Sequence, residues 1–173
     1  MHVLLTGGAG YIGTHTAVEF IRAGHKVTVV DNLSNSSVKA VRRVERLTNS
    51  SIEFHELDLL NEPPLDEVFA KSNFDAVVHF AGLKAVGESV SKPLSYYKNN
   101  ISGTINLLEC MLRHGVNKLV FSSSATVYGE PDRVPMDETF EIRDAANPYG
   151  RTKLVIEKIL EDVCRSNPIM NVA

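Results

Sequence analysis

The fold of this chain is decided by the stretch Thr6-Gly7-Gly8-Ala9-Gly10-Tyr11-Ile12-Gly13. An apolar run precedes it at residues 2–5, and apolar residues then recur at helical spacing up to Gly24, where a glycine ends the helix. Gly8, Gly10 and Gly13 fit G-x-G-x-x-G, while Gly7, Gly10 and Gly13 fit G-x-x-G-x-x-G. Either spacing lets backbone N–H groups approach a pyrophosphate at a helix N-terminus. Strand, glycine loop and helix together predict a dinucleotide site.

An acidic residue follows the next apolar run. Val27-Thr28-Val29-Val30 ends at Asp31, 18 residues after Gly13. A carboxylate there can accept hydrogen bonds from both ribose hydroxyls of an adenosine, and it repels a 2′-phosphate. Since no arginine adjoins it in Asp31-Asn32-Leu33-Ser34-Asn35-Ser36, we expect NAD rather than NADP. An isolated aspartate would instead be interpreted as a turn residue at a strand end.

The rest of the chain alternates between strand and helix patterns. The sequence predicts strands at 2–6, 26–31, 52–56, 75–80 and 117–122, and helices at 12–23, 37–48, 64–71, 93–114 and 149–167. Such alternation is typical of an α/β fold with a doubly wound parallel sheet, the Rossmann-like NAD-binding domain. Asp58, the segment 80–82 and the serine run 122–124 each follow a strand, so we expect them to meet at one crevice.

A second motif is Tyr149 and Lys153, in Asn147-Pro148-Tyr149-Gly150-Arg151-Thr152-Lys153. Residues four apart share a helix face, so the ammonium can stabilise a phenolate. Free tyrosine titrates near 10, and a base at pH 7 therefore needs its pKa lowered by roughly two to four units. By itself such a pair is more typical of a solvated helix start. The glycine loop in the same chain favours the catalytic interpretation.

Charge and composition narrow the classes of partner. The formal net charge is −3 with acids and bases interspersed, which disfavours nucleic acid and a membrane surface as partners. No run approaches a transmembrane helix, so we expect a cytoplasmic protein with a small-molecule partner. Cys110 and Cys164 lack redox or metal spacing and are expected to be reduced, packed thiols. No metal site is expected either, because these histidines have no partner spacing: His15, His25, His55 and His114.

Four segments resemble those of the UDP-glucose 4-epimerases, a family of extended short-chain dehydrogenases/reductases. They are 7–13, 147–150, His79-Phe80-Ala81-Gly82-Leu83-Lys84-Ala85-Val86-Gly87-Glu88-Ser89 and Ser122-Ser123-Ser124-Ala125-Thr126-Val127-Tyr128-Gly129. The resemblance runs from end to end of the chain. The glycine loop and the Tyr-x-x-x-Lys pair are shared by the whole superfamily, whereas the stretch around Lys84 is more specific to the epimerases.

The resemblance implies a redox-neutral inversion at carbon 4 of UDP-glucose or UDP-galactose. Tyr149 would take the proton of the 4-hydroxyl while tightly held NAD accepts the hydride, and the transient 4-ketose would turn over before both are returned. Ser124 would hydrogen-bond the reacting hydroxyl. Lys153 would contact the nicotinamide ribose and lower the pKa of Tyr149. The implied catalytic residues are therefore Tyr149, Lys153 and Ser124.

The resemblance also implies contact positions, each of which singly is also explained by strand-end packing. Lys84 would contact the cofactor pyrophosphate, and the substrate contacts would be Lys84, Ser124 and Tyr149. The other implied cofactor contacts are Gly7, Gly10, Tyr11, Ile12, Gly13, Asp31, Asn32, Leu33, Ser34, Asn35, Ser36, Asp58, Leu59, Phe80, Ala81, Gly82, Asn99, Ser122, Tyr149 and Lys153.

A neighbouring reaction class is tested by two residues. Related nucleotide-sugar dehydratases carry an Asp-Glu pair directly after the hydroxyl residue, because expelling water needs a second proton donor and acceptor. Here those positions are Ala125 and Thr126, and neither can act as a general acid. Elimination is therefore disfavoured. Reductases that use a diffusing cofactor are disfavoured less strongly, since cofactor retention cannot be read from residues.

Residues 167–173 are typical of a helix exit and the opening of a sixth strand. In the family the chain continues into a smaller domain that grips the uridine nucleotide. We therefore expect residues 1–173 to be an incomplete NAD-binding domain that lacks the C-terminal substrate domain and retains NAD binding more readily than turnover.

A non-enzymatic alternative is a nucleotide-binding or subunit-pairing module. It is favoured by two helices with wide apolar arcs, which the family commonly uses to form a homodimer. The arcs consist of Ile101, Ile105, Leu108, Met111 and Leu112 on one helix, and of Leu154, Val155, Ile159, Leu160 and Val163 on the other.

Overall fold

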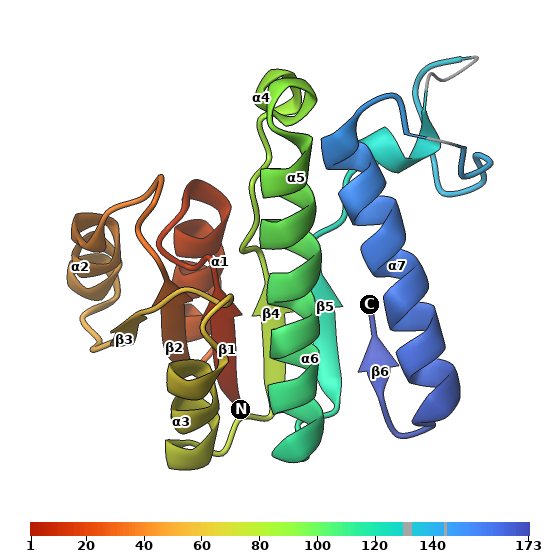
Figure 1. Ribbon diagram of the computed structural model, residues 1–173. Helices are drawn as coiled ribbons and strands as arrows, with labels where there is room; N and C mark the ends of the chain where they lie inside the picture. The colour runs from red at the N-terminus through yellow and green to blue at the C-terminus, as the bar shows by residue number, and fades with distance from the viewer. Residues whose placement is uncertain (130–132, 144) are drawn as a thin grey trace.

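The computed structural model describes residues 1–129, 133–143 and 145–173, and six parallel strands in it form one sheet (Figure 1). Their order is β3-β2-β1-β4-β5-β6. The strands are β1 His2–Thr6, β2 Lys26–Asp31, β3 Glu53–Glu56, β4 Ala76–His79, β5 Lys118–Phe121 and β6 Asn171–Val172. The predicted doubly wound sheet is confirmed, as is the opening of a sixth strand.

Helices connect the strands and cover both faces of the sheet. In Figure 1, α3, α6 and α7 lie along one face of the sheet. α1 and α2 contact each other and contribute to the hydrophobic cluster on the other face. The helices are α1 Tyr11–Arg22, α2 Val38–Thr48, α3 Glu62–Lys71, α4 Val86–Ser91, α5 Pro93–Tyr96, the π-helix η1 Tyr97–Ser102, α6 Gly103–Arg113, the 3₁₀-helix η2 Ala125–Tyr128 and α7 Pro148–Ser166. Every predicted helix is present.

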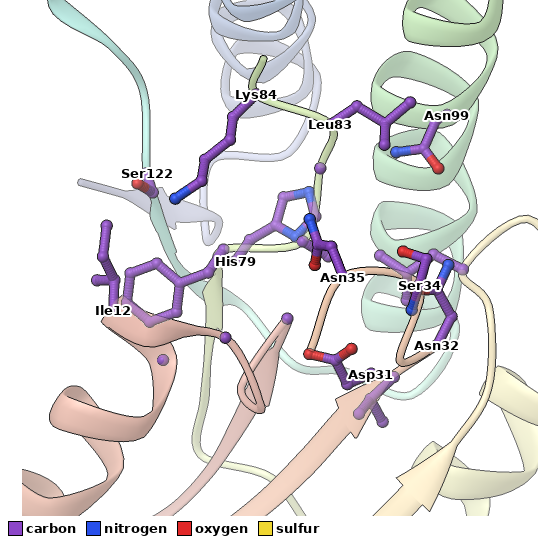
Figure 2. A pocket seen from close by; sticks show the side chains of 18 of the residues that line it. Ile12, Asp31, Asn32, Ser34, Asn35, His79, Leu83, Lys84, Asn99 and Ser122 are labelled. Atoms are coloured by element: carbon purple, nitrogen blue, oxygen red, sulfur yellow. The ribbon is translucent and has the colours of Figure 1, made fainter. Parts of the chain in front are cut away.

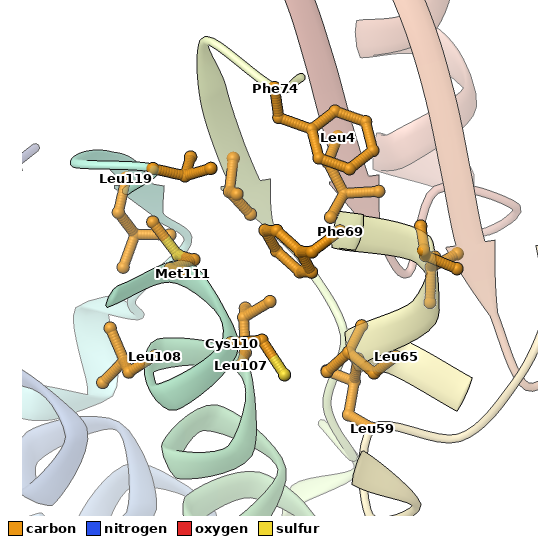
Figure 3. Packing of buried hydrophobic residues seen from close by; sticks show 14 of the residues in the cluster. Leu4, Leu59, Leu65, Phe69, Phe74, Leu107, Leu108, Cys110, Met111 and Leu119 are labelled. Atoms are coloured by element: carbon orange, nitrogen blue, oxygen red, sulfur yellow. The ribbon is translucent and has the colours of Figure 1, made fainter. Parts of the chain in front are cut away.

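The two faces of the sheet have separate hydrophobic clusters. Leu4 of β1 belongs to the cluster that includes Phe69 of α3 and Met111 of α6 (Figure 3). Its neighbours Val3 and Leu5 belong to the cluster that includes residues of α1 and α2. Successive side chains of a strand point to opposite faces, so this division follows from the period of two. Truncating a core residue such as Leu4 to alanine costs about 2–5 kcal/mol.

The predicted helix at 93–114 differs from the observed one in its middle. α5, η1 and α6 follow one another without a gap, but residues 97–102 are π-helical. A π-helix bonds residue i to i+5, so this segment holds one residue more than a regular turn would. The sequence pattern carries no signal for that insertion.

The short helix α4 is missed by the sequence pattern. Its first residues, Val86 and Gly87, have weak helix propensity, and the buried side chain of Tyr96 holds the start of the helix in place. The Tyr96 hydroxyl contacts Ala85 O at 2.9 Å and Glu88 Oε2 at 3.0 Å. Tertiary contact therefore supplies what local preference lacks.

The topology places the site. The strands all run in the same direction. β1 and β4 are neighbours in the sheet, and the order of the strands reverses between them. Ligands of open α/β sheets bind at such a switch point, outside the carboxyl ends of the strands.

Candidate active site

The strand ends open into a cleft of about 330 Å³, which is within the usual size range of ligand sites. In the view of Figure 2, Asp31 and Ile12 lie below the cleft, and Lys84 and Asn99 lie above it. Ile12 lies at the start of α1 and Asp31 at the end of β2, while Lys84 lies in the loop after β4 and Asn99 in η1. The cleft thus joins both halves of the sheet.

The glycine loop brings backbone where a side chain could not fit. Gly7 has a φ of +68°, and a Cβ there would lie 2.6 Å from Ala81 N. A Cβ on Gly13 would lie 2.6 Å from Gly7 O. α1 begins after Gly10 without a side-chain cap, so its first N–H groups are left for an anion. The cradle therefore fits a pyrophosphate.

Asp31 links the two loops on the lower wall of the cleft. Its Oδ2 accepts a hydrogen bond from Ala9 N at 3.0 Å, and its Oδ1 accepts from Leu33 N at 2.9 Å and from Ser36 Oγ at 2.7 Å. A carboxylate offers about four acceptor positions. One remains, on Oδ2, for a donor such as a ribose hydroxyl.

A buried asparagine holds the loop that carries Lys84, and the sequence analysis missed it. Asn100 Oδ1 accepts from Leu83 N at 2.8 Å, and its Nδ2 donates to Leu83 O at 2.9 Å and to Thr152 Oγ1 at 3.0 Å. Thr152 donates onward to Tyr149 O at 2.7 Å. Asn100 therefore joins this loop to the first turn of α7. Its signal in the sequence is a polar residue on the same helical stripe as Met111.

His79 connects the floor of the cleft to α6. Thr6 Oγ1 lies 2.6 Å from His79 Nδ1, and His79 Nε2 lies 2.9 Å from Thr104 Oγ1. Because the Thr104 hydroxyl donates to Asn100 O at 2.6 Å, it accepts from His79, which places the imidazole proton on Nε2. Complete burial, together with the charge of Lys153, lowers the pKa of His79 to about 3. The ring is therefore neutral at physiological pH.

Lys153 is almost fully buried, with 6% of its surface exposed. Its Nζ donates to Ser122 O at 2.8 Å and lies 4.6 Å from the centre of the Phe121 ring. Burial lowers the pKa of Lys153 to about 8, and the carboxylate of Glu157 acts in the opposite direction. Lys153 thus carries its charge at neutral pH within a dry wall of the cleft.

Ser124 caps the short helix η2. Its Oγ accepts from Thr126 N at 3.2 Å and from Thr126 Oγ1 at 2.9 Å. Two accepted bonds use both lone pairs of the hydroxyl, so its own proton is left to be donated. Thr126 therefore sets Ser124 as a hydrogen-bond donor.

The cleft gathers most of the predicted site residues. The predicted residues that line it are Gly7, Gly10, Tyr11, Ile12, Gly13, Asp31, Asn32, Ser34, Asn35, Asp58, Leu59, Phe80, Ala81, Gly82, Lys84, Asn99, Ser122, Tyr149 and Lys153. Leu33, Ser36 and Ser124 lie outside the lining: the first two hydrogen-bond Asp31, and Ser124 caps η2. The lining also includes residues that were not predicted as site residues: Val30, Leu57, His79, Leu83 and Ser123.

Within the described residues, none of the helices combines the length and apolar character that crossing a membrane requires. The same residues contain no group of three or more His, Cys, Asp or Glu placed to hold a metal. Both cysteines are free; Cys110 is buried and Cys164 is partly buried.

The fold and the cleft define a dinucleotide-binding α/β domain with a Tyr-x-x-x-Lys pair at the cofactor edge. The chain belongs to the NAD dependent epimerase/dehydratase family, whose model matches residues 3–173. It is 59% identical to the UDP-glucose 4-epimerase of Dictyostelium discoideum over 169 residues, which are 98% of this chain and 49% of that protein. It is also 59% identical to the UDP-glucose 4-epimerase uge1 of Schizosaccharomyces pombe over 175 residues, covering 99% of this chain and 49% of that protein.

Solved structures agree with these relatives. The UDP-glucose 4-epimerase of Bifidobacterium longum, crystallised with NAD+ and UDP, superimposes with a TM-score of 0.98 at 48% identity. The match covers 99% of this chain and 51% of that one. The chain therefore spans about half the length of the relatives it matches.

Proposed function

We propose that this chain forms the cofactor-binding and catalytic half of an NAD-dependent UDP-glucose 4-epimerase. The observation that carries the proposal is the meeting of the glycine loop with Tyr149 and Lys153 at one cleft. Relatives at 59% identity that are named UDP-glucose 4-epimerase support it. Ala125 and Thr126 support epimerisation over dehydration, because neither supplies the second acid that water loss requires.

The residues present fit NAD. The cradle at Gly7 and Gly13 leaves room for a pyrophosphate against the start of α1, and the free acceptor position of Asp31 suits a ribose hydroxyl. The negative charge of Asp31 favours NAD over NADP. Lys84 on the opposite wall would neutralise the pyrophosphate. When bound, the cofactor would supply a reversible hydride acceptor.

Tyr149 acts as the base, and later the acid, at the 4-hydroxyl of the hexose. Ser124 donates a hydrogen bond to the reacting oxygen, because Thr126 already occupies its acceptor positions. Lys153 supplies positive charge that favours the phenolate of Tyr149. Tyr149 takes one proton from the sugar and returns it, and the hydride lost from carbon 4 would be returned as well, so the reaction is an isomerisation with no net redox change.

The substrates we propose are UDP-glucose and UDP-galactose, with Lys84, Ser124 and Tyr149 in contact with them. The protein would act in the cytoplasm. Residues 1–173 would form an incomplete NAD-binding domain of the enzyme, and contacts to the uridine nucleotide would come from elsewhere in a longer chain.

The enzyme would form a homodimer through α6 and α7. Ile105, Leu112 and Val155 support this, because they are 38%, 39% and 39% exposed on those helices. Other residues of both arcs pack inward, including Leu108, Met111 and Leu160. A mass in solution that stays monomeric at all concentrations would rule the dimer out.

The test is to incubate the chain with UDP-galactose, with and without added NAD, and to measure the nucleotide retained and the UDP-glucose formed. Retained NAD is the expected result. UDP-glucose formed in addition would mean that the present residues complete a working site. Failure to retain any nucleotide, in a chain that is folded by circular dichroism, would contradict the proposal.

A further inference from the structure

Two successive turns of α7 hold two successive residues after β5. Lys153 Nζ donates to Ser122 O at 2.8 Å, and one turn later Glu157 accepts a hydrogen bond from Ser123 Oγ. Residues four apart share a helix face, so Tyr149, Lys153 and Glu157 form one row. The segment that leads to Ser124 is therefore fixed to the row that carries the proposed base.

Glu157 is the negatively charged partner of Lys153, whose pKa lies only slightly above neutral pH. Lys153 is buried against the Phe121 ring, and burial brings the pKa of its ammonium down to about 8, with Glu157 acting to raise it. Without that carboxylate, the lowering of the pKa of Lys153 by burial would be unopposed, and the pKa would fall toward neutral pH. A neutral amine could no longer stabilise a phenolate.

The other titratable groups on the walls do not replace this charge. His79 of β4 is neutral because of its burial. Tyr149 stands one turn before Lys153, and Lys84, on the loop after β4, brings a second positive charge to the same cleft. Asp31 lies on the wall formed by β2, at the opposite half of the sheet.

We propose that Glu157 is a positioning residue for the Tyr149–Lys153 pair. Held by the Ser123 hydroxyl, its carboxylate fixes the Ser122–Ser124 segment to α7 and supplies the negative charge that keeps Lys153 an ammonium in the cleft. The effect of Glu157 on turnover rests on the proposed function, whereas its effect on the charge of Lys153 is independent of that function.

The test follows the Cε and Nζ resonances of Lys153 by NMR in the isotope-labelled chain between pH 6 and 11, without nucleotide or sugar. Glu157→Gln keeps the shape and removes the charge. We expect the proton affinity of Lys153 to fall roughly threefold or more. Glu161→Gln is the matched control: Glu161 lies one turn further on, is paired with Lys158 and Arg165, and should leave Lys153 unchanged.

Ser123→Ala gives a second, independent variant, because it keeps the carboxylate but frees it from its anchor. It should lower the proton affinity of Lys153 by less than Glu157→Gln does. An unchanged Lys153 titration in both variants, or equal shifts in Glu157→Gln and Glu161→Gln, would overturn the proposal. Since the chain is titrated without ligands, a failure to retain NAD or to turn over UDP-galactose would contradict the proposed function and leave this result standing.

Discussion

Residues of the glycine loop 7–13 and the group Ser122, Ser123, Tyr149 and Lys153 line the same cleft. The loop, which we call the backbone wall, acts through its main chain, whereas the second group, the side-chain wall, acts through its side chains. At Gly7 and Gly13 any added Cβ meets main-chain atoms at 2.6 Å. At Lys153 and Ser124, by contrast, side-chain atoms make the hydrogen bonds: Lys153 Nζ donates to Ser122 O, and Ser124 Oγ accepts from Thr126 Oγ1. We therefore expect that NAD binding and catalysis can be lost separately, by substitutions in different walls of the cleft.

The largest effect should come from the side-chain wall. Tyr149→Phe removes the proposed base and keeps the ring, so in a form of the protein that turns over UDP-galactose we expect kcat to fall about 10⁴-fold. NAD retention should be unchanged, because the backbone cradle is untouched. Tyr97→Phe, which removes a hydroxyl outside the cleft, is the control. Loss of NAD from Tyr149→Phe would break the separation of the two walls.

The next effect tests His79, which joins β1 to α6. Its pKa is about 3 in the folded protein and near 6.5 when unfolded, so the unfolded state binds more protons between these values. Its contribution to stability is complete above pH 6.5 and is lost as the pH falls toward 3, by on the order of 4 kcal/mol.

Urea unfolding at pH 7 and at pH 4 measures this loss in the wild-type chain and in His79→Gln, which can still donate and accept. We expect the wild-type chain to lose more free energy of unfolding on acidification than the variant does. Equal losses would show that His79 does not carry the effect. If the variant does not fold, the ring of His79 can be titrated directly by NMR, and protonation above pH 5 would contradict the prediction.

A smaller effect should come from the backbone wall. Gly13→Ala forces a Cβ against Gly7 O, so the loop must shift, and we expect NAD affinity to fall about 100-fold. Calorimetric titration measures it. Gly87→Ala is the control, since a Cβ at Gly87 meets nothing within 4 Å. Wild-type affinity in a folded Gly13→Ala chain would mean that the cradle is less rigid than its contacts indicate.

The smallest effect concerns Asp31, whose side chain hydrogen-bonds the backbone wall at Ala9 N. Asp31→Asn keeps the shape and removes the charge, so the preference for NAD over NADP should fall about tenfold. Competition between the two nucleotides measures it, with Asp162→Asn as the control, since Asp162 lies on α7, pairs with Arg165 and is outside the lining of the cleft. A preference that does not change would show that Asp31 acts only as the acceptor for Ala9 N and Leu33 N.

The backbone wall was predictable and the side-chain network was not. Apolar runs and glycine spacing are local patterns, so the strands, α1 and the dinucleotide loop follow from the sequence alone. Asn100 and His79 are polar residues in apolar patterns, and their partners Leu83, Thr152 and Thr104 lie 17 to 52 residues away. Only the packing of the sheet brings them together. The catalytic roles of Tyr149 and Lys153 rest on the resemblance and stay predictions.

The π-helical segment Tyr97–Ser102 has a consequence for how many residues the chain can hold at this point. Each residue turns an α-helix by roughly 100°. Deleting one residue here would let α5 and α6 close into a regular helix, which is locally the simpler structure. Because the π-helical turn already contains the extra residue, Tyr96 and the chain before it would keep their orientation relative to α6. This helix can therefore lose one residue without turning α5 against α6, provided that the residue lost is neither Asn99, which lines the cleft, nor Asn100, which holds Leu83 and Thr152.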